Sequence, residues 1–254
     1  MDRTTTTPDA LPIPGKKQIV YTQTRVLHTD PRYLKRHRII SGPNDPIEGP
    51  FKVLRTQVRQ RMRANGWQTL AITSAHEGAG KTLTSVNLAI TLARDVNQTV
   101  LLVDLDLRRP SVASYFTKEK LPGLSEYLLN DIPLSDLLFN PEGVDGLVVL
   151  PGDRPIMHSS EMLSSPRMVA LAEEVKQRYP SRIVLLDMPP VLGCDDVLAF
   201  SPYFDAALLV VEENRTTREE VAQSLELLKG TRLLGTVLNK SHEEVPNYGY
   251  PVAS

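Results

Sequence analysis

The sequence predicts an α/β fold in which a doubly wound, mostly parallel sheet lies between two layers of helices. An apolar segment runs into a glycine-rich turn and then a helix over residues 69–82. Two further segments, 100–108 and 183–190, each contain an apolar strand with aspartate at its end. Apolar strands that alternate with helices are typical of a parallel sheet covered on both faces and joined by right-handed crossovers.

The elements can be placed in order along the chain. The first is a helix from Phe51 to Asn65, whose apolar residues recur on one helical face. Strands are expected at 69–73, 100–105, 147–151, 183–187, 206–211 and 234–238. The helices between them include one that begins near Lys81, one from Leu121 to Leu129 and one from Glu161 to Gln177.

Composition divides the chain into three parts. Residues 1–44 are expected to form a flexible N-terminal arm, because prolines and the Thr4 to Thr7 run disfavour regular structure. Residues 45–241 carry the alternating strands and helices, and residues 242–254 form a C-terminal tail with two tyrosines. Within the arm, Arg32 to Arg38 is a basic patch that could contact an acidic membrane surface or a partner's tail, or could simply be solvated.

Charge and hydrophobicity exclude several classes of protein. With 254 residues and a formal net charge of -1, the chain lacks the general basic character of a nucleic-acid-binding protein. It contains no apolar run that could span a bilayer and no signal-peptide pattern, so a cytoplasmic location is expected. Cys194 is the only cysteine, which excludes an intrachain disulfide, and a small buried side chain is its expected role.

The glycine-rich turn has the features of a phosphate-binding loop. Gly78 and Gly80 let the backbone turn tightly and point successive N–H groups inward, and the following helix adds unpaired amides and the positive end of its dipole. Lys81 would reach the β- and γ-phosphates, and the Thr82 hydroxyl would hold Mg²⁺. The usual first glycine of such loops is replaced by Ala75.

Aspartates follow two of the buried strands. Asp104 and Asp106 are expected to point to the same side of a strand, because side chains alternate. Two carboxylates at this place repel each other and are costly to desolvate, so a divalent cation or a nearby arginine would stabilise them. Asp187 follows the other apolar run, where a parallel sheet opens onto its ligand crevice, and Pro189 and Pro190 then prevent a helix.

Together these motifs resemble those of the bacterial tyrosine kinases of capsule and exopolysaccharide biosynthesis, in their free-standing cytoplasmic form. The resemblance runs from about Glu48 to the C-terminus. Beside the glycine loop, it is carried by Asp104-x-Asp106-x-Arg108-Arg109-Pro110, Ser160-Glu161-Met162-Leu163, Asp187-x-Pro189-Pro190 followed by Asp196, and the run from Leu234 to Asn239. It implies a three-layer P-loop NTPase domain of the deviant Walker type that uses ATP and Mg²⁺.

The resemblance also implies a role for each matching residue. The catalytic residues would be Lys81, Asp104, Asp106 and Asp187. The nucleotide would be bound by Gly78, Ala79, Gly80, Lys81, Thr82, Leu83 and, on the adenine side, Asn239. The metal ion would be held by Thr82, Asp104 and Asp187. Such kinases phosphorylate tyrosines near their own C-terminus, here Tyr248 and Tyr250, and Asp106 is the candidate to accept or orient the phenol proton.

The same resemblance implies partners. A free-standing member needs a separate transmembrane activator, which would recruit it to the inner face of the membrane, and members assemble into homo-oligomeric rings through an E-x-x-R-x-x-R helix face. Here the aligned positions are Gly49, Lys52 and Arg55, with Glu48 one position early, so the number of subunits is left open.

A switch ATPase related to the cell-division and plasmid-partition ATPases is the alternative function. It would share the sheet and all three motifs, so the fold does not discriminate between the two. Those ATPases carry a second lysine early in the loop, where this chain has His76. That difference and the tail tyrosines favour the kinase. An iron–sulfur ATPase would need at least two cluster cysteines, and a degenerate scaffold would not need Lys81 and the aspartates.

Overall fold

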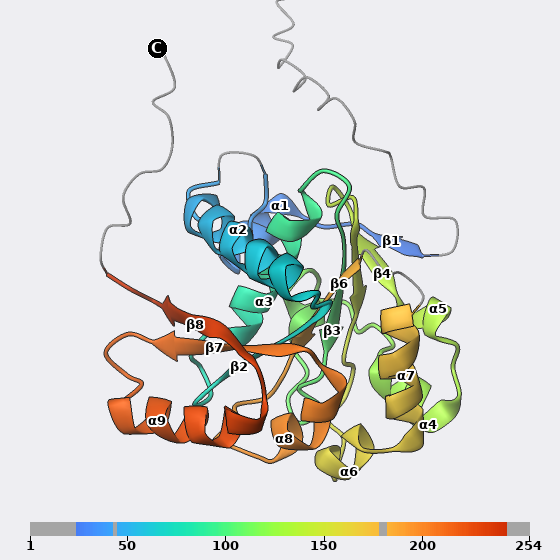
Figure 1. Ribbon diagram of the computed structural model, residues 1–254. Coiled ribbons are helices and arrows are strands. Elements are labelled where there is room, and N and C mark those ends of the chain that lie inside the picture. Colours follow the sequence, from blue (N-terminus) through green and yellow to red (C-terminus); the bar gives the residue numbers. More distant parts are fainter. Residues whose placement is uncertain (1–23, 43–44, 178–181, 243–254) are drawn as a thin grey trace, which may run out of the picture.

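The computed structural model describes residues 24–42, 45–177 and 182–242 (Figure 1). Its strands are β1 (Arg25–Leu27), β2 (Thr69–Ser74), β3 (Thr99–Asp104), β4 (Phe139–Pro141), β5 (Leu147–Leu150), β6 (Arg182–Asp187), β7 (Ala206–Glu212) and β8 (Leu233–Asn239). Over the described ranges they form one eight-stranded sheet in the order β1-β4-β5-β3-β6-β2-β7-β8. Neighbours are parallel except β4 with β5, so the predicted sheet is confirmed.

Helices cover both faces of the sheet and complete the three layers (Figure 1). They are α1 (Pro31–Arg36), α2 (Glu48–Asn65), α3 (Lys81–Ala93), α4 (Leu124–Asn130), α5 (Leu134–Leu137), α6 (Ser159–Leu163), α7 (Pro166–Gln177), α8 (Asp196–Phe200) and α9 (Arg218–Leu227). Helices α1, α2 and α3 pack into the core on one face, and α4 to α8 pack into the core on the other.

The predicted strands are all confirmed, to within one residue at each end. The central strands β2, β3 and β6 are buried along almost their whole length, because helices cover both of their faces. Their carboxyl ends therefore meet at one edge of the sheet. This edge carries the glycine loop and the aspartates that the sequence singled out.

The expected flexible arm is wrong for residues 24–42. Strand β1 pairs with β4, and the chain that follows α1 buries Ile39 and Ile40 in the core. The Asn87 side chain of α3 accepts a hydrogen bond from the Ile40 N–H (2.9 Å) and donates one to the Arg38 carbonyl (3.0 Å). Apolar residues scattered among prolines and cations thus suffice to dock this segment, while residues 1–23 lie outside the described ranges.

Helix α1 carries the predicted basic patch. Its N-terminus is capped by Asp30, whose side chain accepts a hydrogen bond from the backbone of Arg32 (2.8 Å), and Pro31 occupies the first helical position. Leu34 is buried, and the patch residues Arg32, Lys35, Arg36 and Arg38 are exposed. Contact of this patch with a membrane or a partner stays a prediction.

The single helix expected from Glu161 to Gln177 is divided into α6 and α7. Pro166 has no N–H to donate, and its ring disfavours a helical conformation at Ser165. Helix α6 therefore ends at Leu163, and α7 begins at Pro166. The break lets α6 lie near the glycine loop, at the carboxyl ends of the central strands, while α7 packs against the face of the sheet.

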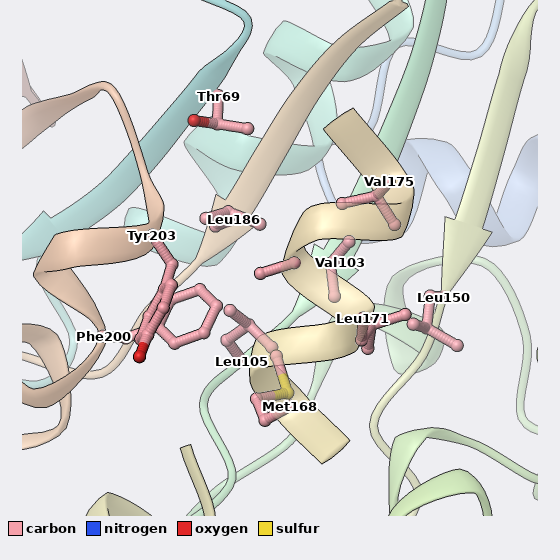
Figure 2. Close-up of a pocket in the computed structure, with 11 residues that line it drawn as sticks. Thr69, Val103, Leu105, Leu150, Met168, Leu171, Val175, Leu186, Phe200 and Tyr203 are labelled. Atoms are coloured by element: carbon pink, nitrogen blue, oxygen red, sulfur yellow. The ribbon is translucent and has the colours of Figure 1, made fainter. Parts of the chain in front are cut away.

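Figure 2 shows the core beneath α7, where a small cavity is enclosed by this helix, the sheet and the turn after α8. Met168 and Leu171 reach into it from α7, and Phe200 closes it from the other side. With about 20 Å³ it has room for about one water molecule, and its lining is almost wholly apolar. We interpret it as a packing gap.

Candidate nucleotide site

The loop between β2 and α3 has the backbone of a phosphate cradle. Gly78 (φ 81°) and Gly80 (φ 91°) both adopt the left-handed conformation that favours glycine. Ala75 has no positive φ and is buried, so the loop does not need a glycine at this position. The Ser74 hydroxyl donates to the His76 carbonyl (2.7 Å) and holds the start of the loop.

Asn239 lies against this loop from the end of β8. Its side-chain N–H₂ group donates a hydrogen bond to the Ala79 carbonyl (2.8 Å). A Cβ atom on Gly80 would come within 2.1 Å of the same nitrogen, so a side chain here would displace the Asn239 amide as well as strain the backbone. The structure thus places Asn239 as a support of the loop, and its expected contact with adenine stays a prediction.

Lys81 is enclosed by the carboxylates that the sequence predicted. Its Nζ atom lies 2.7 Å from Asp106 Oδ2 and 3.6 Å from Asp187 Oδ2, and its side chain is 11% exposed. Burial opposes the charge of this ammonium group, but Asp187 and Asp106 outweigh that effect and raise the pKa of Lys81. The lysine is therefore positively charged at every physiological pH.

Asp187 is held by two hydroxyls of α3. Thr82 Oγ1 donates to one carboxylate oxygen (2.7 Å) and Ser85 Oγ donates to the other (2.9 Å). Burial raises the pKa of Asp187, although Lys81 and these hydroxyls oppose the increase. Sequence reasoning missed Ser85, yet it lies one helical turn after Lys81 and Thr82, so the spacing alone could have indicated it.

Asp104 and Asp106 have different surroundings, which corrects the expectation that they share one side of a strand. Strand β3 ends at Asp104, and Asp106 lies in the following turn. Asp104 stands opposite Asp187 in the parallel pairing and accepts hydrogen bonds from the backbone of Ser111 (2.8 Å) and Val112 (2.9 Å). Burial, reinforced by the charge of Asp187, raises the pKa of Asp104 to about 7.

These contacts distinguish the two aspartates: Asp104 supports the backbone, whereas Asp106, although also buried, lines a cleft. Backbone N–H groups donate to both oxygens of Asp104, that of Asp106 to Oδ1 (3.3 Å) and those of Ser111 and Val112 to Oδ2, so the carboxylate holds the turn after β3 in place. Asp106 instead contacts Lys81 and lines a cleft outside the loop. Direct binding of a metal ion by Asp104 would compete with the backbone contacts, whereas Thr82 and Asp187 already lie side by side.

The cleft beside the loop holds about 770 Å³, within the usual range for ligand sites. Its walls come from the loop, the turn after β3, the segment that leads into α6 and the turn after β6. Pro189 and Pro190 line one wall, and the Pro189 carbonyl accepts a hydrogen bond from the Thr73 hydroxyl (2.6 Å). The cleft is large enough for a side chain with its flanking peptide.

Arg108 borders this cleft, and two hydrogen bonds hold its side chain in place. It donates to the Ser159 hydroxyl (2.9 Å) and to the buried carboxylate of Asp196 (3.3 Å). Cys194 also lines the cleft and is half-buried, so the expectation of a buried cysteine is only partly met. Burial raises the pKa of the Cys194 thiol to about 11, so it is protonated at neutral pH.

Gly152 provides a stability test of this arrangement. A Cβ atom there would lie 2.3 Å from the Pro110 side chain and 3.3 Å from the Asp104 carboxylate. We expect Gly152→Ala to displace the turn after β3 and to lower the free energy of unfolding by about 1–3 kcal/mol, as overpacking does. Urea denaturation would measure this. Gly230→Ala, where nothing lies within 4 Å of the new atom, is the control, and equal stabilities of the two variants would contradict the contact.

Tyr248 and Tyr250 lie outside the described residues. In the part of the chain that is described, no three histidine, cysteine or acidic side chains are grouped as a ready metal site. None of the described helices is both long enough and apolar enough to cross a membrane.

Comparisons with known proteins agree with this geometry. The AAA domain family model matches residues 67–233. The tyrosine-protein kinase YwqD of Bacillus subtilis is 32% identical over 205 residues, which is 79% of this chain and 84% of the relative. The kinase domain of the Escherichia coli tyrosine kinase ETK has a TM-score of 0.71 at 27% identity and covers 91% of this chain and 95% of its own. The EpsB protein of Ralstonia nicotianae is 30% identical over 92% of this chain, which spans only 30% of EpsB.

Proposed function

Because the chain belongs to the AAA domain family and, within it, to the bacterial tyrosine-protein kinases, we propose that it is an ATP-dependent protein-tyrosine kinase. The proposed kinase phosphorylates itself and regulates the synthesis and export of exopolysaccharide or capsule. The observation that carries this proposal is the position of Asp106, which contacts the loop lysine on one side and faces an open cleft on the other.

The donor set fits a nucleotide with a divalent cation. Lys81 is enclosed with Asp104, Asp106 and Asp187, so the site holds more buried carboxylates than cations. Burial, with a smaller contribution from the neighbouring carboxylates, raises the pKa values of Asp104 and Asp187. Bound Mg²⁺-ATP supplies the phosphoryl group and the neutralising charge. Thr82 and Asp187 would hold the metal ion, and Asp104 would lie next to Asp187 in the sheet. Oxygen donors are the ligands that Mg²⁺ prefers.

The chain's own residues would position the reactants and stabilise charge, which is most of what phosphoryl transfer requires of a protein. The loop amides and Lys81 would bind the phosphates. Asp106 would accept the proton of an acceptor tyrosine that enters through the cleft, because an unperturbed phenol has a pKa near 10 and needs such help at neutral pH. Pro189 and Pro190 would form a wall for its ring.

We propose Tyr248 and Tyr250 of the tail as the acceptors. Pro246, Gly249 and Pro251 disfavour regular structure around them, so their phenols would be available to another molecule. We propose that each tail enters the site of a neighbouring molecule and not its own. Phosphorylation would then depend on protein concentration.

The proposed partners are a transmembrane activator at the inner face of the membrane and further copies of the chain. In α2, the side chain of Glu48 is buried and its carboxylate contacts Lys52 (2.9 Å) and Arg94 (3.0 Å). These contacts occupy the carboxylate that would otherwise be available to a neighbour, so an assembly through α2 would rely on other side chains such as Arg55.

Tail variants test this function against the switch-ATPase alternative. We expect Tyr248→Phe with Tyr250→Phe to lose most of the phosphate that wild-type protein incorporates from labelled ATP. Tyr127→Phe, in which only the hydroxyl of a described tyrosine is removed, should label like wild type. If the double variant incorporates as much label as wild type, the tail is not the acceptor. If wild type hydrolyses ATP and never labels tyrosine, the switch ATPase is the better account.

A further inference from the structure

The turn between β7 and α9 is attached to the phosphate loop. His76 Nε2 lies 2.9 Å from the Thr216 hydroxyl, and that hydroxyl oxygen also accepts a hydrogen bond from the Glu212 backbone (3.0 Å). The turn is therefore held at a fixed place beside the loop, although it comes more than 130 residues later in the chain. The alternating apolar pattern of the sequence gives no indication of this contact.

Arg215 projects from this turn over the loop. A Cβ atom on Gly78 would lie 3.0 Å from Arg215 Nη1, so the guanidinium group sits directly against the loop backbone. Because Gly78 has a positive φ and no side chain, nothing separates the arginine from the part of the chain that would wrap the phosphates.

The arginine is only weakly engaged where it lies. Its one ion pair among the described residues is with Glu212, at 3.4 Å, and its side chain is 58% exposed. A charge-assisted hydrogen bond is usually 2.7–2.9 Å long, and exposed ion pairs contribute little. Glu212 itself is better paired with Lys240 (2.8 Å), which lowers the pKa of Glu212 and leaves Arg215 available to an incoming anion.

Other cations near the loop already have partners. Lys81 is buried between Asp106 and Asp187, and Arg109, which is exposed like Arg215, pairs with Glu77. A triphosphate carries several negative charges, and an arginine with a free face is well suited to bind phosphate oxygens in a bidentate manner. We propose that Arg215 is a second cationic contact for the phosphates of the bound nucleotide and reaches them across Gly78.

This inference rests on the proposed nucleotide site and is tested by separate variants. Arg215→Ala removes the charge, Arg215→Lys keeps it, and Arg218→Ala is the matched control, because Arg218 is exposed on the adjoining helix and makes no ion pair among the described residues. The dissociation constant of Mg²⁺-ATP would be measured for each full-length protein at low and high salt, alongside the melting temperature without nucleotide.

We expect Arg215→Ala to bind ATP roughly tenfold or more weakly at low salt, since a hydrogen bond to a charged group is of that strength. The variant should also lose part of the salt dependence of binding, which a purely structural role would not change. Arg215→Lys should recover much of the affinity, and Arg218→Ala should match wild type with an unchanged melting temperature in all variants.

Two results would overturn the proposal. One is an Arg215→Ala protein with the affinity and salt dependence of wild type. The other is an equal loss in Arg215→Ala and Arg218→Ala, which would indicate a general effect of charge. A wild-type protein that binds no ATP at all would instead contradict the nucleotide site, so the two failures are distinguishable.

Discussion

Lys81→Met is expected to abolish tyrosine phosphorylation and to reduce the stability of the protein without nucleotide. The lysine would contribute a charge-assisted contact worth about 1.5–3 kcal/mol in ATP binding, and a single preorganised donor is typically worth about 10²–10³ in rate. Its removal also leaves Asp106 and Asp187 buried without their cation, which should cost on the order of 3 kcal/mol.

Phosphate incorporation, ATP titration and urea denaturation measure these three effects. Lys229→Met is the control, because Lys229 forms only an exposed ion pair with Glu226 and should change none of them. Mg²⁺-ATP at about 100 times its dissociation constant should stabilise the wild type by roughly 2.7 kcal/mol. A Lys81→Met protein that turns over ATP as fast as wild type would disprove the site.

Asp106→Asn is expected to separate binding from transfer. The amide oxygen can still accept the hydrogen bond that the Arg109 backbone donates to Asp106 (3.0 Å), so the turn should keep its shape. The side chain could no longer accept a phenol proton, and loss of a general base typically lowers the rate by about 10²–10⁴. ATP binding should therefore persist while labelling of tyrosine is lost.

Asp187→Asn is the matched comparison, because Asp187 contacts the hydroxyls of Thr82 and Ser85 at the proposed metal position. This variant should weaken the dependence of ATP binding on Mg²⁺. Titrations with and without Mg²⁺, run beside labelling assays, distinguish the two variants. An equal loss of ATP binding in both would contradict the division of roles between Asp106 and Asp187.

The sequence predicted the centre of the sheet and the β8 edge well, but not the edge that β1 and β4 form. The runs that form β2, β3 and β6 are long and apolar, because these strands are buried on both faces. Strands β1 and β4 have only three residues each, and their pairing joins Arg25 to Phe139, so no local pattern reveals them. The apolar residues that dock the segment before α2 stand singly among prolines and cations, so they form no local pattern either.

The candidate site shows the same division. The motifs indicated Lys81, Thr82 and Asp187, which the structure brings together. Lys81 and Thr82 begin α3, which follows β2, and Asp187 ends β6, the strand beside β2. The different surroundings of Asp104 and Asp106 depend on where β3 ends, which the alternation of side chains could not decide. The positions of Asn239 and Arg215 beside the loop, and of Gly152 beside the turn after β3, result from contacts between distant segments, so only the folded chain reveals them.

The most direct test of the central claim is to incubate purified wild-type protein with γ-labelled ATP and Mg²⁺ and to locate the label by mass spectrometry. We expect label on tyrosine within the C-terminal peptide, at a rate that rises with protein concentration, and none in Lys81→Met incubated alone. ATP consumption without phosphotyrosine, with the activator present, would contradict it.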